Sequence, residues 1–164
     1  MLSRASLALL LALTACTRSP APPPPEAPVT FTARALGVSL DSPANWPARE
    51  VAQDGGQFVV VEASPQERLV LSRLAGFSGS LEASEAQVAQ QVAAKFPRTT
   101  TRPSQPATVA GRPALRTEVS LSSGQQGVRY LVTGGWVVEF QTRPDHAALV
   151  TPAFEQVIAT LRLP

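Results

Sequence analysis

The chain offers few side chains that could do chemistry. Its 164 residues include one cysteine, Cys16, and one histidine, His146. A single cysteine excludes both an internal disulfide and a cysteine-based zinc site, and most metal or proton-relay sites need more than one histidine. Asp145 and His146 follow an alternating apolar stretch, so we expect Asp145 to cap a turn or helix there. We therefore expect no catalytic residues, no metal and no cofactor.

Serine-based chemistry is not supported either. Gly76-Phe-Ser-Gly-Ser80 lacks the Gly-x-Ser-x-Gly order of hydrolases. The sequence also contains no phosphate-binding loop and no dinucleotide fingerprint. An enzyme is the least favoured class of function.

The residues before Cys16 have the parts of an export signal. Arg4 gives a positive start, and residues 5–14 are apolar or small. An apolar helix of about ten residues is roughly 15 Å long, half of a bilayer core, which suits a signal peptide and not a membrane span. The last four residues resemble a bacterial lipobox: Leu13, Thr14, Ala15 and Cys16. This resemblance implies lipid on the Cys16 sulfur and cleavage before Cys16. The alternative is an ordinary signal peptide with a chance cysteine.

Lipid on Cys16 would hold the mature protein on a membrane. Each buried methylene contributes about 0.8 kcal/mol, so two or three acyl chains make attachment effectively permanent. Thr17 stands where some diderm bacteria place the aspartate that retains lipoproteins at the inner membrane. We therefore expect an extracytoplasmic protein, on the outer membrane if the cell has one and otherwise on the outer face of the cell membrane.

Residues 17–28 form a proline-rich segment with the sequence TRSPAPPPPEAP. Proline lacks an N–H group and fixes φ, so this segment favours extended polyproline II structure over helix or sheet. At about 3.1 Å per residue it would span roughly 40 Å. We interpret it as a tether that holds the globular part away from the lipid headgroups. The alternative is a proline-rich ligand for another domain.

Residues 29–164 are expected to form one globular domain. Hydrophobic residues make up 44% of the chain and charged residues 16%, which is enough apolar material for one core. The formal net charge is +2, and the arginines are scattered, with no run that could follow a phosphate backbone. This composition argues against disorder and against nucleic-acid binding.

The hydrophobic periodicity predicts strands, a helix, further strands and a final helix. Residues 29–40 indicate a bent strand or tight hairpin, and more strands are expected at 48–53, 57–63, 68–74, 114–121, 128–133 and 136–142. Residues 80–96 have helical spacing, with Ser84 and Gln87 as a capping box, and Thr151-Pro152 would begin the last helix. This order predicts an α+β fold, an α/β/α sandwich whose mainly antiparallel sheet is flanked by helices.

The last three strands allow a prediction of the sheet faces. With Gly134-Gly135 as a two-residue turn, Thr133 lies opposite Trp136. Extended to the strand at 114–121, with Leu121 opposite Val128, this pairing places three charged residues on one partly polar face: Arg116, Glu118 and Arg129. They could form a docking patch for a partner or a solvated ladder of cross-strand charges. Two tryptophans, Trp46 and Trp136, are interpreted as core, with partner hot spots as the alternative.

The order of elements, together with several short motifs, resembles the PsbP-like superfamily, which includes the Ran-binding Mog protein and bacterial DcrB-like lipoproteins. The motifs are Pro43-Ala-Asn-Trp46, the stretch from Val109 through Gly111 to Arg116, the Gly-Gly hairpin, and the closing helix from Phe154 to Leu161. The resemblance covers roughly residues 29–164. It implies an α/β/α sandwich and a non-enzymatic role, because members dock onto larger complexes or bind partner proteins. Some plant members bind metal ions through histidine and acidic groups, and no such cluster is present in this sequence.

Two functions are consistent with these features. The first is a membrane-anchored, surface-exposed adaptor that binds or helps to assemble an envelope protein complex, which predicts an apolar or mixed surface patch. The second is a binder or carrier of a small apolar or lipid ligand. That function predicts an interior cavity on the order of several hundred Å³, lined by valine and leucine.

Overall fold

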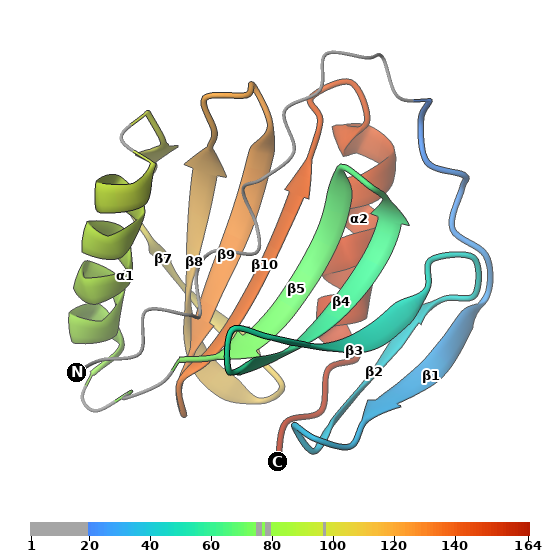
Figure 1. Ribbon diagram of the computed structural model, residues 1–164, viewed down its shortest axis with the longest axis horizontal. Coiled ribbons are helices and arrows are strands. Elements are labelled where there is room, and N and C mark those ends of the chain that lie inside the picture. The colour runs from blue at the N-terminus through green and yellow to red at the C-terminus, as the bar shows by residue number, and fades with distance from the viewer. Residues whose placement is uncertain (1–19, 75–76, 78–79, 97) are drawn as a thin grey trace.

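A twisted antiparallel sheet with one helix on each face forms the centre of the molecule (Figure 1). The computed structural model describes residues 20–74, 77, 80–96 and 98–164. Within them, eight strands form the sheet in the order β3-β4-β5-β10-β9-β8-β6, with β7 also paired to β8. The bounds of these strands are β3 Ala48–Gln53, β4 Gly56–Ser64, β5 Glu67–Arg73, β6 Thr100–Thr101, β7 Gln105–Val109, β8 Arg112–Ser120, β9 Gln126–Val132 and β10 Trp136–Thr142.

The other elements flank this sheet. A separate hairpin is formed by β1 (Pro28–Ala33) and β2 (Val38–Pro43), and the helices are α1 (Leu81–Lys95) and α2 (Ala147–Ala159). Helix α1 contacts β8 and β9, whereas α2 contacts β10 and β2. The predicted α+β fold with a mainly antiparallel sheet is confirmed. Of the two structures expected for residues 29–40, a bent strand or a tight hairpin, the structure has the hairpin.

The larger part of the core lies between the sheet and α2. The Trp46 ring meets the Phe154 ring at a centroid distance of 5.3 Å, and Phe154 meets Phe140 at 5.4 Å. Trp46 is 0% exposed and Trp136 is 2% exposed, so both tryptophans are core residues as predicted. Edge-on aromatic packing of this kind adds to the free energy gained from burying apolar area.

Helix α1 lies on the opposite face and begins earlier than its predicted cap. Ser80 is the N-cap, because its side-chain oxygen accepts a hydrogen bond from the Ala83 N–H. Ser84 is buried inside the first turns and donates to the Ser80 carbonyl, so the predicted capping box at Ser84 and Gln87 is wrong. The helix begins at Leu81, the first apolar residue of this stretch, which lies upstream of the predicted cap at Ser84.

Helix α2 also begins earlier than predicted. It starts at Ala147, and Thr151 and Pro152 lie inside it. Val150 is 0% exposed, so the extra turn buries one more apolar side chain, which outweighs the single backbone hydrogen bond that Pro152 cannot make. The N-cap is His146, whose side chain makes no hydrogen bond to the first turn of the helix, and Asp145 instead accepts hydrogen bonds from Arg143 at 2.7 and 3.0 Å. The predicted Asp145 cap is therefore wrong.

The predicted register of the last three strands is also wrong. Val132, not Thr133, lies opposite Trp136, so the connection holds three residues, with Gly134 and Gly135 both at positive φ. On the next strand Arg116 lies opposite Tyr130. Since side chains alternate between faces, a change of one residue in a turn moves a whole strand's side chains to the other face.

Candidate functional site

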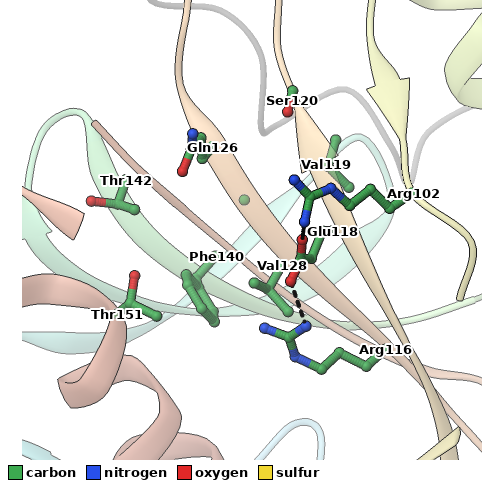
Figure 2. Close-up of a pocket in the computed structure, with 11 residues that line it drawn as sticks. Arg102, Arg116, Glu118, Val119, Ser120, Gln126, Val128, Phe140, Thr142 and Thr151 are labelled. Carbon is green, nitrogen blue, oxygen red and sulfur yellow. Dashed lines mark hydrogen bonds and ion pairs between the residues drawn. The ribbon is translucent and has the colours of Figure 1, made fainter. Parts of the chain in front are cut away.

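An open hollow of about 240 Å³ lies on the α2 face, beside the ends of β8, β9 and β10 (Figure 2). Helix α2 contributes one wall through Thr151, and the segment between β6 and β7 contributes Arg102 on the other side. The rest of the lining comes from the strands: Arg116, Glu118, Val119, Ser120, Gln126, Gly127, Val128, Phe140 and Thr142. The floor contains apolar groups of Val128 and Phe140, and the rim is polar.

A chain of charges spans one side of this hollow. Arg102 Nη1 donates to Glu118 Oε2 at 2.8 Å, and Arg116 Nη1 donates to Glu118 Oε1 at 3.0 Å, so each oxygen of one carboxylate binds a different guanidinium. The hydrogen bond from Arg116 holds the pKa of Glu118 below its usual value. The side chain of Arg102 is 79% exposed and that of Arg116 is 28% exposed. Arg102 therefore presents its charge to solvent, whereas Arg116 is fixed in the wall.

Contacts with Tyr130 and Glu155 also hold the Arg116 side chain in place. Arg116 Nε donates to the Tyr130 hydroxyl at 3.2 Å, and that hydroxyl donates to Glu155 Oε2 at 2.7 Å. Arg116 Nη2 also lies 3.8 Å from Glu155 Oε1. Burial, followed by the carboxylate of Glu155, raises the pKa of Tyr130 to about 12. The network joins β8, β9 and α2 and fixes the direction in which the Arg116 guanidinium points.

The structure brings together only two of the three predicted patch residues. Arg116 and Glu118 share the hollow, but Arg129 lies on the opposite face of the sheet, 7% exposed. Its Nε donates to Glu139 Oε2 at 2.8 Å, and Glu139 is 6% exposed. Including Arg129 in an exposed patch is therefore wrong, because the register that grouped it with Arg116 is wrong.

Sequence analysis missed Arg102 and Thr151 as members of this site. Arg102 stands next to Pro103 in a stretch expected to be loop or edge, and Thr151 was expected to cap a helix. Neither position has a local pattern that predicts proximity to Arg116. The sequence shows only that the segment around Arg102 is polar and is followed by the alternating strand at 114–121. That pattern does not say which residue Arg102 contacts.

The lining of the hollow contains groups that can bind an oxyanion. Guanidinium groups bind carboxylates and other oxyanions, and hydroxyl and amide groups at Ser120, Gln126 and Thr151 can orient a ligand. The lining contains one carboxylate, Glu118, and both of its oxygens are bound by Arg102 and Arg116. The hollow can hold a group that is partly apolar and carries a negative charge.

His146 has a structural position elsewhere. Its Nδ1 lies 2.5 Å from Glu67 Oε1, and Ser64 Oγ donates to Glu67 Oε2 at 2.7 Å. The carboxylate thus lies between Ser64 and His146, whereas a catalytic triad needs the histidine between serine and acid. Across the described residues, histidine, cysteine and acidic groups form no cluster of three that could hold a metal ion. The described helices also include none that is both long and apolar enough to cross a membrane.

The arrangement defines an α+β sandwich with a polar hollow, and the particular fold is PsbP-like. The solution structure of cyanobacterial PsbP (CyanoP) from Synechocystis sp. PCC 6803 matches with a TM-score of 0.57 and 14% identity, over 93% of this chain and 99% of that one. A crystal structure from Bacteroides thetaiotaomicron VPI-5482 matches with a TM-score of 0.52 and 12% identity, over 82% of this chain and 48% of that one. At these identities the matches show the fold alone.

A third structure has a weaker match. LpqN, described as involved in cell envelope biogenesis of Mycobacterium tuberculosis, matches with a TM-score of 0.49 and 14% identity, over 85% of this chain and 86% of that one. No protein-family model matches the chain, and no curated protein matches it significantly. The predicted lipobox, Leu13 to Cys16, lies outside the described residues.

Proposed function

We propose that the protein is a lipid-anchored envelope lipoprotein whose PsbP-like domain binds a partner protein and catalyses no reaction. The observation that carries this proposal is the hollow, where Arg102 and Arg116 share the single carboxylate of Glu118 above an apolar floor. The lipobox supports anchoring at Cys16 on the extracytoplasmic side. The partner belongs to the cell envelope, because that is where such an anchor places the domain.

An acidic side chain of the partner would replace Glu118 at Arg102. Exposed ion pairs contribute about 0–1 kcal/mol, so exchanging one carboxylate for another costs little. Arg116 is already held by Tyr130 and Glu155, so less side-chain entropy is lost when the partner binds. A small apolar group of the partner would lie against Val128, which is 7% exposed and lines the floor of the hollow.

The patch is mixed and not broadly apolar. Within the described residues, Val29 is the large hydrophobic side chain that is exposed, at 52%. The adaptor function predicted an apolar or mixed patch, and the charged hollow supports the mixed form. A small apolar ligand is supported less well, because binding it here would remove water from guanidinium groups without replacing their hydrogen bonds.

The anchor can be tested by changing one residue of the full chain. Cys16→Ala removes the sulfur that would carry the lipid, so we expect loss of incorporated labelled fatty acid and release from the membrane fraction. Thr17→Ala serves as the control and keeps both. Fatty-acid labelling that persists in Cys16→Ala would contradict the anchor.

Partner binding can be tested by crosslinking in cells, followed by mass spectrometry of the captured proteins. We expect one abundant envelope protein with the wild-type chain and its loss in Arg102→Glu, which reverses the exposed charge of the hollow. The matched control is Arg34→Glu, at another exposed arginine outside the hollow. Equal capture by both variants would show that the hollow is not the binding surface.

A further inference from the structure

The proline-rich segment does not run free of the domain. Pro22 is buried, and the carbonyl of Pro23 accepts a hydrogen bond from Trp46 Nε1 at 3.1 Å. Asn45 Nδ2 donates to the Pro24 carbonyl at 2.8 Å, and Asn45 Oδ1 accepts from the Glu26 N–H at 3.0 Å. Figure 1 shows this segment in blue, passing beside the loop between β2 and β3 on its way to β1. The expected free tether is therefore attached to the domain over most of its length.

The bonds match the chemistry of polyproline II structure. This helix has no internal hydrogen bonds, so its carbonyls are available to donors on another surface. Domains that recognise proline-rich segments bind this preformed helix at surfaces lined by aromatic side chains. The indole of Trp46 connects the two regions, because its ring packs on Phe154 in the core while its N–H reaches Pro23.

We propose that Asn45 and Trp46 form a binding site for polyproline II structure, and that the chain's own residues 22–26 occupy this site. Docking of this segment then sets the distance between the lipid anchor and the domain. The proposal rests on the lipid anchor at Cys16. With the segment docked, residues 17–21 connect the anchor to the domain, which corresponds to roughly 16 Å of extended chain at about 3.1 Å per residue. With residues 22–26 released, residues 17–26 would give roughly 31 Å. The docked domain therefore lies close to the headgroups, and a competing proline-rich segment would extend its reach.

Hydrogen exchange of the Trp46 indole tests the docking. Trp46 is 0% exposed, so its N–H exchanges only when the segment leaves or the domain unfolds, and Trp136 reports unfolding in the same spectrum. A hydrogen bond contributes about a factor of five to the docking equilibrium. Glu26→Pro deletes one N–H donor without disfavouring polyproline II, so we expect about fivefold faster Trp46 exchange. Asn45→Ala deletes two bonds, and we expect about 25-fold.

The matched control is Glu26→Ala, which keeps the backbone N–H and should leave exchange unchanged. Acceleration confined to Trp46, in the stated order, supports the docking. Equal exchange in all variants, or equal acceleration at Trp136, would overturn it, because the indole would then be protected by the fold and not by the segment.

Neutron reflectometry of the full lipidated protein on a supported bilayer tests the distance. Asn45→Asp places a carboxylate oxygen against the Pro24 carbonyl, so we expect it to release the segment and widen the gap between bilayer and domain by up to roughly 15 Å. An unchanged gap, with Trp46 exchange accelerated, would overturn the claim that docking sets the distance. Failure of the wild-type protein to remain on the bilayer would instead overturn the anchor, while the indole exchange would still report the docking.

Discussion

Arg129 and Glu139 lie opposite each other on neighbouring strands, and their side chains pair at 2.8 Å while being 7% and 6% exposed. Removing two charges from water costs several kcal/mol per ion, so each side chain depends on the other. The pair occupies the centre of the face that also carries α1. It gives β9 and β10 a polar contact that only one register satisfies.

This pair predicts a strong asymmetry between single and double variants. Arg129→Met leaves the Glu139 carboxylate buried without a cation, so we expect a loss of about 3–5 kcal/mol in the free energy of unfolding. Arg129→Met combined with Glu139→Leu should be at least as stable as the wild type. Urea unfolding followed by tryptophan fluorescence measures both. A single variant as stable as the double variant would show that the pair is solvated.

Tyr130 predicts a clear alkaline titration. It is the chain's one tyrosine, so absorbance of the phenolate reports this residue alone. Its folded pKa is raised to about 12, mainly by burial, while the unfolded value is near 10. Because the folded pKa is the higher one, the stabilisation is complete below pH 10 and is lost as pH rises through 12.

The check is an absorbance titration of the native protein and of the protein in urea, in which the midpoint should fall from about 12 to about 10. Tyr130→Phe has no phenol to titrate, so the part of the fall in the free energy of unfolding that Tyr130 causes between about pH 10 and about pH 12 should be absent. A native midpoint near 10 would mean that the hydroxyl is not buried against Glu155.

The start of α1 predicts unequal losses of stability when either of two serines, one turn apart, is replaced by alanine. Ser80→Ala removes the oxygen that accepts from the Ala83 N–H, so we expect a loss of about 1 kcal/mol. Ser84→Ala removes only a bond to a carbonyl of its own helix and improves helix propensity, so we expect a smaller effect. Thermal unfolding of both variants compares them, and a larger loss at Ser84 would restore the cap predicted from the sequence.

The hairpin between β7 and β8 predicts a stabilising substitution. Ala110 has φ 51° and Gly111 has φ 72°, so Ala110 occupies a left-handed position that asparagine tolerates better. Ala110→Asn should raise the free energy of unfolding by about 0.5 kcal/mol. Asp54 has φ 49° in the matching turn between β3 and β4, so Asp54→Ala should lower it by a similar amount. Equal signs for the two changes would contradict this account of the turns.

Several features of this protein follow from the sequence alone. The turn residues Asp54-Gly-Gly56, between the expected strand at 48–53 and the apolar run at 57–63, predict a hairpin, and the structure has β3 and β4 there. The apolar runs identify Trp46, Trp136 and Phe154 as core. Local periodicity and turn chemistry act over a few residues, so they fix the type and order of elements and, with them, the α+β fold.

The tertiary structure decided what lies next to what. The connection at residues 121–125 sets the register that places Arg116 opposite Tyr130 and Arg129 on the other face, and the three-residue turn at 133–135 sets the register between β9 and β10. Arg102 meets Glu118 across a strand pairing, and Pro23 meets Trp46 because β1 and β2 return the chain beside its own start. Such contacts join residues distant in sequence, and their energies depend on burial and on shared partners. No local pattern contains that information, so the hollow and the docked proline segment appear only in the folded chain.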